Sequence, residues 1–323
     1  MTPSGSSRAG LVLGASFLIL AAFVAWNRVF QVDEAQNVYG LWLLGSHKFS
    51  TYDFYAPPHH FLLRPLLWFA DTAPALYLSV RMAWLAAFAA LGWLLLRASG
   101  IRPGEPLFTP AVAALGLTAP LWTYGLEIRH EVPGVLALLG CWTLLAPFDG
   151  KPRRFAYLLV GGLSGFVLLN APKHILFLAP LLLLAFVRPH PAYSPRSRFR
   201  LFAGLSGGFL AGVSLLLLLH LGFGSAGVMV RTYFAFFQGV SDVKRTLPQP
   251  LVEVLLLQTP LLVGFLLWRA GEFVAHAGRT LLSDPWRSGA AQWIWMGSVF
   301  WGPWPIPWPS PTTRWPSLRS VGS

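Results

Sequence analysis

The chain has 323 residues and a net charge of +12, with 55% hydrophobic and 11% charged residues. A soluble domain carries about 25% charged residues, so this composition excludes an ordinary soluble protein and indicates helices that cross a bilayer in apolar blocks of about 20 residues. The lysines and arginines lie in short segments between these blocks, as in cytoplasmic loops, and we therefore expect no nucleic-acid partner.

The first predicted membrane helix covers residues 10–30 and is followed by two adjacent carboxylates, Asp33 and Glu34. A charge near hydrocarbon is costly unless it is solvated or used, so the pair is a candidate site. The alternative is an ordinary polar helix end at the interface. The pair opens a loop that we expect to carry a short amphipathic helix. Residues 49–60 follow (FSTYDFYAPPHH), and their aromatic and ionisable side chains exceed what a connector needs. An apolar piece over 61–69 fits the membrane interface.

Further membrane helices are predicted along the rest of the chain, for a total of eight to nine in an all-α polytopic fold. They cover residues 75–96, 107–125, 132–148, 155–170, 172–187, 201–222 and 251–268, with a weaker ninth over 290–302. Beyond them the prolines are too dense for a spanning helix. We therefore expect a transmembrane domain over residues 1–302 and an irregular tail over 303–323, and we expect this C-terminus to be truncated or frame-shifted.

The basic residues predict the orientation of the chain in the membrane. With the N-terminus inside, the cytoplasmic loops contain the basic segments 97–102, 151–154 and 188–200. The opposite side receives the Asp33 loop, residues 127–131, Lys173 and residues 223–250. This orientation satisfies the positive-inside bias in each successive loop. The acidic segments should therefore face the periplasm or exterior of a bacterial inner membrane.

The order and sidedness of these segments resemble the polyprenyl-phosphate-sugar-dependent glycosyltransferases of the C-type fold, namely the protein O-mannosyltransferases and the lipid A aminoarabinose transferases. The first element is the Asp33–Glu34 pair with its Tyr/Pro/His-rich loop. The second is EIRHEVP over residues 127–133, which is similar to the pattern Arg-x-Asp/Glu-x-Pro. The third is Lys173, which opens an apolar run that continues to Leu178, Ala179 and Pro180. The likeness covers about residues 10–270.

The resemblance implies transfer of a hexosyl or pentosyl group from a polyprenyl-phosphate donor to a hydroxyl of a lipid, glycan or protein acceptor. Asp33 would be the general base and Glu34 its supporting neighbour. Glu127 or Glu131 would be the second acid, which orients the acceptor, the base or a divalent metal ion, the one cofactor to consider. A carboxylate at a partly dry membrane surface is suited to take the acceptor proton.

The departing phosphate needs cations, and the candidates are Arg129, Lys173 and Arg231. The alternatives are an interfacial ion pair for Arg129 and a snorkelling helix end for Lys173. Arg81 lies within a predicted span and faces either an aqueous cavity or the outer interface.

Other polar residues are less informative about chemistry. Adjacent His59 and His60 have no metal-ligand spacing, so a polar loop role is favoured, and His130 alone does not make a metal site. Cys141, the single cysteine, excludes an internal disulfide and argues against a thiolate metal site. The alternative function is non-enzymatic: a transporter or flippase of lipid-linked substrates, which would place charges near the middle of broken helices. The third hypothesis is that the chain is a structural membrane subunit.

Overall fold

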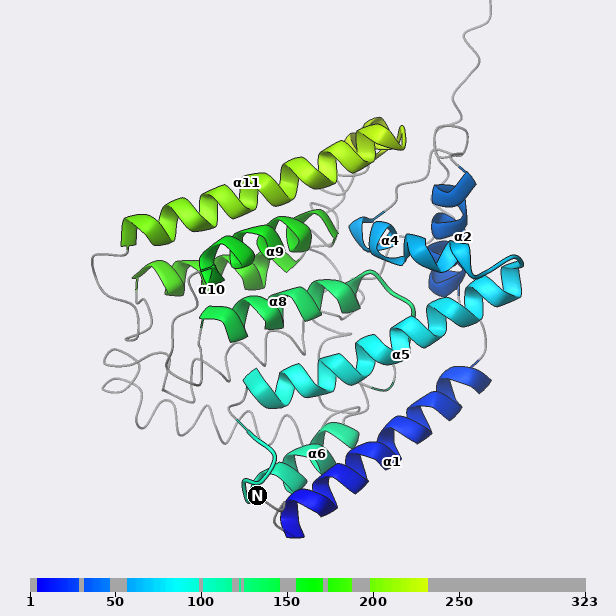
Figure 1. The fold of residues 1–323 in the computed structure, drawn as a ribbon, viewed down its shortest axis with the longest axis vertical. Helices are drawn as coiled ribbons and strands as arrows, with labels where there is room; N and C mark the ends of the chain where they lie inside the picture. The colour runs from blue at the N-terminus through cyan, green and yellow to red at the C-terminus, as the bar shows by residue number, and fades with distance from the viewer. Residues whose placement is uncertain are drawn as a thin grey trace, which may run out of the picture.

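The computed structural model describes residues 5–28, 32–46, 57–98, 101–117, 122, 125–145, 155–170, 174–187 and 198–231. The regular structure in this part of the chain is helical throughout, which confirms the predicted all-α class (Figure 1). The predicted helices over 251–268 and 290–302 and the tail over 303–323 lie outside the described residues.

Within the described ranges, three helices are long and apolar enough to cross a bilayer. They are α1 (Gly5–Asn27), α5 (Ala73–Ala98) and α11 (Arg198–Gly222). The apolar helices α8 (Glu131–Leu145) and α9 (Ala156–Asn170) have 15 residues each. At 1.5 Å per residue they measure about 22 Å, which is less than the roughly 30 Å of the hydrocarbon core. The remaining elements are α2 (Val32–Ser46), α4 (Pro58–Leu63), the 3₁₀ helix η1 (Arg64–Trp68), α6 (Phe108–Gly116) and α10 (Ile175–Val187).

Two elements differ from their predictions. The helix predicted over 107–125 is described as α6, which ends at Gly116. The loop after the first span is predicted to carry an amphipathic helix, and the helix α2 found there already begins at Val32, so Asp33 and Glu34 lie on the helix rather than in a loop before it. Its buried positions Glu34, Val38 and Leu41 recur at helical spacing and face inward, while Tyr39 and Trp42 are exposed on the other side.

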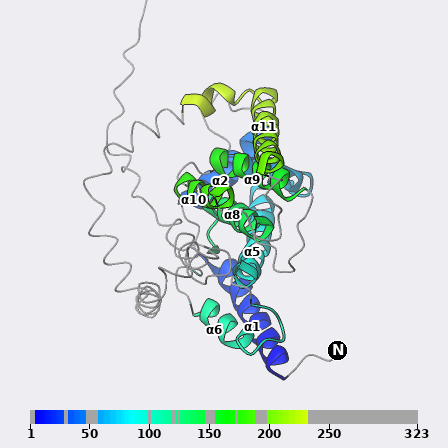
Figure 2. The ribbon, with the colours of Figure 1, turned by 90° about the vertical axis from the view of Figure 1, so that its left-hand side faces the viewer.

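Five helices stack in the order α11, α9, α8, α5 and α1 in two perpendicular views, with α6 beside α1 (Figures 1 and 2). The main core lies between α5, α8 and α9 and includes the buried side chains of Leu138 and Trp142. A second core beneath α2 and α4 includes Leu44, Trp84 and Ile128. Arg28 at the end of α1 lies 3.5 Å from Glu127 in the segment before α8, so the end of α1 and the approach to α8 meet at one end of the stack.

The contact between α9 and α11 depends on glycine. The facing positions are Gly161, Gly162 and Gly165 on α9 and Gly204, Gly208 and Gly212 on α11. A Cβ atom at Gly208 would collide with the carbonyl oxygen of Leu158, and one at Gly161 would collide with that of Leu205. Small residues at four-residue spacing allow the two backbones to approach this closely, as in many membrane helix pairs.

We expect Gly208→Ala to destabilise the protein by about 1–3 kcal/mol, because the added methyl group forces the two backbones apart. The matched control is Gly207→Ala on the same helix. A Cβ there meets nothing within 4 Å, so the better helix propensity of alanine should leave stability unchanged or raised by up to about 1 kcal/mol. Thermal unfolding in detergent measures both variants. Equal melting temperatures for the two would contradict the close approach of α9 and α11.

Candidate functional site

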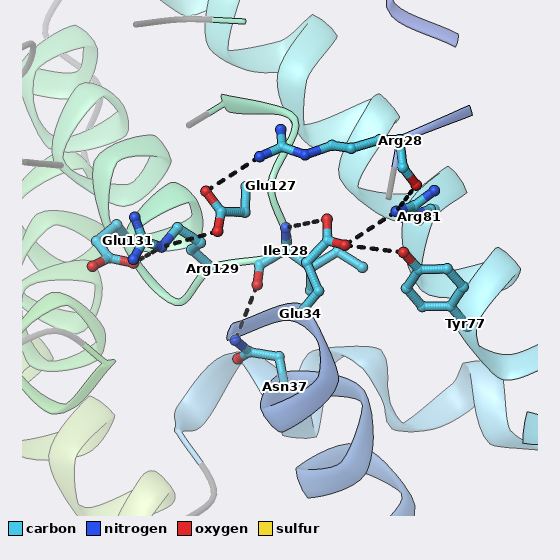
Figure 3. A network of polar contacts seen from close by, with 9 residues as sticks. All are labelled: Arg28, Glu34, Asn37, Tyr77, Arg81, Glu127, Ile128, Arg129 and Glu131. Carbon is cyan, nitrogen blue, oxygen red and sulfur yellow. Dashed lines mark hydrogen bonds and ion pairs between the residues drawn. The ribbon is translucent and has the colours of Figure 1, made fainter. Parts of the chain in front are cut away.

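The two acidic segments predicted from the sequence lie in contact. The backbone N–H of Ile128 donates to Glu34 Oε1 at 3.4 Å, and the side-chain amide of Asn37 donates to the carbonyl oxygen of Ile128 at 3.0 Å (Figure 3). The first turns of α2 are thereby joined to the segment that leads into α8. Hydrophobic burial holds this junction in place, since Ile128 and Val38 belong to the same core.

Glu34 is fully buried and is held by an ion pair. Arg81 Nη2 lies 3.1 Å from Glu34 Oε2, and the Tyr77 hydroxyl donates to the same oxygen at 2.9 Å. Arg81 also donates to the carbonyl oxygens of Ala25 and, at 2.9 Å, Arg28, and its Cζ lies 4.3 Å from the Tyr77 ring centroid. A cation at the last carbonyls of α1 also complements the helix dipole. Arg81 therefore faces inward and joins α1, α2 and α5.

The second acidic segment carries a further set of ion pairs. Glu127 lies 3.5 Å from Arg28 and 3.8 Å from Nε of Arg129, whose Nε is also 3.9 Å from Glu131. Glu131 additionally contacts Nδ1 of His130 at 3.5 Å. Both glutamate side chains are 5% exposed, whereas His130 is 43% exposed. Burial makes pairing necessary for these carboxylates, and His130 is the most exposed of the side chains that form these ion pairs.

A buried polar network lies beside these ion pairs. Nδ1 of His59 is 2.9 Å from Oδ1 of Asn170, and its Nε2 is 3.1 Å from Oδ1 of Asn37. Nε2 of His60 lies 3.4 Å from the same Asn37 oxygen. The Asn170 amide donates to the carbonyl oxygen of His130. The network therefore joins α2, α4, α9 and the segment before α8.

Burial sets the charge state of both histidines. It lowers the pKa of His59 from 6.5 to about 3, with the Asn170 hydrogen bond acting in the opposite direction. It also lowers the pKa of His60 well below 6.5, and the neighbouring His59, His130 and His220 act in the same direction. Both rings are thus neutral at pH 7, because a charged ring would lose its hydration.

This burial predicts a pH-dependent stability. The unfolded chain binds protons at His59 and His60 near pH 6.5, and the folded chain does not until much lower pH. The contribution of the two neutral histidines to the free energy of unfolding is therefore fully present above about pH 6.5, and it is lost as the pH falls towards 3. Melting temperatures measured between pH 7 and pH 4 should decrease, and the double variant His59→Gln/His60→Gln should lose part of this slope. An identical slope in the variant would contradict the prediction.

The predicted site residues are distributed as follows. Glu34, Glu127, Arg129 and Glu131 lie together in one cluster. Asp33 lies in the first turn of α2, but its side chain is outside the described part of the structure. Lys173 is also outside the described residues, and Arg231 is exposed in the helical turn that ends the described chain.

Sequence reasoning overlooked four residues of the cluster and of the polar network beside it: Arg28, Asn37, Tyr77 and Asn170. Arg28 and Asn170 each lie where an apolar run ends. A polar side chain at such a position could have marked both residues as site candidates from the sequence. Asn37 lies one turn after Asp33 and shares a helix face with it. Among the described residues, no group of three or more His, Cys, Asp or Glu side chains is placed to hold a metal ion.

Comparison of the chain with protein-family models, with curated proteins and with solved structures found no match.

Proposed function

We propose that the chain is a polytopic membrane glycosyltransferase. It transfers a sugar from a polyprenyl-phosphate donor to an acceptor hydroxyl at the periplasmic face of a bacterial inner membrane. The observation that carries this proposal is the contact of Glu34 and Asn37 with Ile128. It joins the two acidic segments on which the resemblance to C-type glycosyltransferases rests.

The partners of Glu34 support Asp33 as the general base. Glu34 is buried and accepts hydrogen bonds from Tyr77, Arg81 and the Ile128 backbone. A carboxylate held in this way is poorly placed to take a proton from an acceptor, since protonation would leave the Arg81 charge uncompensated. Asp33, the preceding residue at the start of α2, is the remaining carboxylate of the pair.

The proposed step has balanced proton and electron movements. The Asp33 carboxylate accepts the proton of the acceptor hydroxyl, whose oxygen attacks the anomeric carbon of the donor sugar. The bond between that carbon and the phosphate oxygen breaks, and the electron pair leaves with polyprenyl phosphate. Arg129 and Lys173 are the proposed cations that stabilise the departing phosphate. Glu127 and Glu131 hold Arg129 in position.

The position of the charges also favours an enzyme over a transporter. The cluster forms where α1 ends and α8 begins, with contributions from α2 and α5. Charges at helix ends on one side suit chemistry on a lipid head group, whereas a transporter usually places its charges near the bilayer midplane. The proposal includes eight to nine membrane helices, of which α1, α5 and α11 are candidates within the described residues.

A transfer assay tests the function. The full chain in proteoliposomes is incubated with a panel of radiolabelled polyprenyl-phosphate sugars and with candidate acceptors, including lipids with free hydroxyl groups. We expect one donor to give a labelled acceptor and free polyprenyl phosphate in equal amounts. Movement of the intact donor between leaflets, with no product, would instead identify a flippase and overturn the proposal.

Reporter fusions test the sidedness. Fusions after residues 154 and 200 should read as cytoplasmic, because both follow clusters of basic residues. A fusion near residue 52 should read as external. A cytoplasmic reading at residue 52 would contradict the scheme, because the acidic segments would then face nucleotide sugars rather than lipid-linked ones.

A further inference from the structure

The buried histidines of α4 have no role in the proposed reaction, yet they belong to a polar network that joins α2, α4, α9 and the segment before α8. His59 and His60 are each 1% exposed, and Asn170 is 2% exposed. Water does not reach these groups, so their hydrogen bonds must come from one another.

The two asparagines have fixed orientations. Asn37 donates from Nδ2 to the carbonyl oxygen of Ile128 at 3.0 Å, and Asn170 donates from Nδ2 to the carbonyl oxygen of His130. Asn170 Oδ1 additionally accepts the backbone N–H of His59 at 3.1 Å. Since each NH₂ group must face a carbonyl oxygen, each side-chain oxygen must face the histidine rings.

A neutral ring has one N–H, so each histidine can donate to one of these two oxygens. His59 donates from Nδ1 to Asn170 at 2.9 Å, and His60 donates from Nε2 to Asn37 at 3.4 Å. Nε2 of His59 then lies 3.1 Å from Oδ1 of Asn37 without donating a hydrogen bond to it. The other nitrogen of His60, Nδ1, is buried and has no hydrogen-bond partner in the described part of the chain, as suits a ring protonated at Nε2. Each asparagine thus accepts a hydrogen bond from a histidine ring and donates one to a backbone carbonyl oxygen.

We propose that His59 is a positioning residue for Arg129. The carbonyl oxygens of Ile128 and His130 flank Arg129 in the chain, and each accepts a hydrogen bond from one asparagine. His59 contacts both asparagines and is itself packed against the buried Trp84 ring at 5.7 Å. Hydrogen bonds that start from the histidines of α4 therefore restrain the backbone on both sides of Arg129. We call this set of hydrogen bonds the clamp.

The consequence for ligand binding rests on the proposed function. The Nε atom of Arg129 lies 3.8 Å from Glu127 and 3.9 Å from Glu131, and ion pairs at such distances restrain a guanidinium less than short bidentate ones do. A fixed backbone compensates for that weakness. The ligand class that needs such a fixed cation is a phosphate monoester or diester on a lipid, which the planar guanidinium binds through two parallel N–H groups.

Hydrogen exchange of the full chain in detergent tests the clamp without any ligand. His59→Phe keeps the ring and removes the donor, and we expect exchange of the amides in residues 125–131 to increase about tenfold, as for loss of one buried hydrogen bond. The helix α11 serves as the internal reference. His59→Gln restores an N–H donor and should recover part of the protection. Trp84→Phe is the matched control, since it removes buried packing beside His59 and no hydrogen bond of the clamp.

A second measurement uses polyprenyl phosphate without sugar as the probe. His59→Phe should weaken its binding about tenfold and should add nothing to Arg129→Gln, because both changes remove the same positioned cation. Unchanged exchange in His59→Phe, or equal loosening by Trp84→Phe, would overturn the clamp whatever the binding data show. Loosening by His59→Phe in a chain that binds no polyprenyl phosphate would support the clamp and overturn the proposed donor instead.

Discussion

Sugar transfer by the Asp33→Asn variant should fall by about 10²–10⁴-fold, the usual contribution of a positioned general base. Asparagine keeps the size and the hydrogen bonding of aspartate but cannot accept the acceptor proton. Binding of the polyprenyl-phosphate donor should change far less, because the phosphate contacts other groups and only the proton transfer is lost. Steady-state transfer rates and donor binding, measured on the same preparation, separate the two effects.

The matched control is Glu34→Gln, one residue further along α2. Glutamine still accepts hydrogen bonds from Tyr77 and from the backbone of Ile128, as Glu34 does. We therefore expect a milder loss of turnover than in Asp33→Asn. Near-normal turnover by Asp33→Asn would refute its assignment and return the role of base to Glu34 or Glu131.

The second large effect concerns stability. Arg81→Met should destabilise the protein by about 3–5 kcal/mol, because it leaves the carboxylate of Glu34 buried without its cation. The variant also removes the donor that holds the carbonyl oxygens of Ala25 and Arg28 at the end of α1. Chemical unfolding in detergent, followed by circular dichroism, measures this loss.

Two further variants make the measurement specific. Adding Glu34→Gln to Arg81→Met removes the orphaned charge and should recover part of the lost stability, which would demonstrate coupling between the two residues. Arg97→Met changes the arginine in the last turn of the same helix and should alter stability by less than about 0.5 kcal/mol. Equal effects of Arg81→Met and Arg97→Met would contradict the buried ion pair.

Helix positions could be predicted from the sequence because apolar runs are a local property. The span predicted over 75–96 corresponds to α5 (Ala73–Ala98), and that predicted over 201–222 corresponds to α11 (Arg198–Gly222). The end of α6 at Gly116 was not predictable in this way, since the apolar run continues beyond it. Hydropathy measures transfer out of water and does not identify where a backbone stops being helical.

Residue type and position along the chain were sufficient to select Glu34, Glu127, Arg129 and Glu131 as candidates. Which charges meet was decided by the tertiary structure alone. Arg81 rather than Arg129 pairs with Glu34, and Arg28 reaches Glu127, because the end of α1, the start of α2 and the approach to α8 converge. An ion pair between distant segments depends on distances of a few ångströms, and no local pattern encodes such a distance. For the same reason the roles of Asn37 and Asn170 could not be predicted, because their hydrogen bonds to residues before α8 form only once the helices have packed.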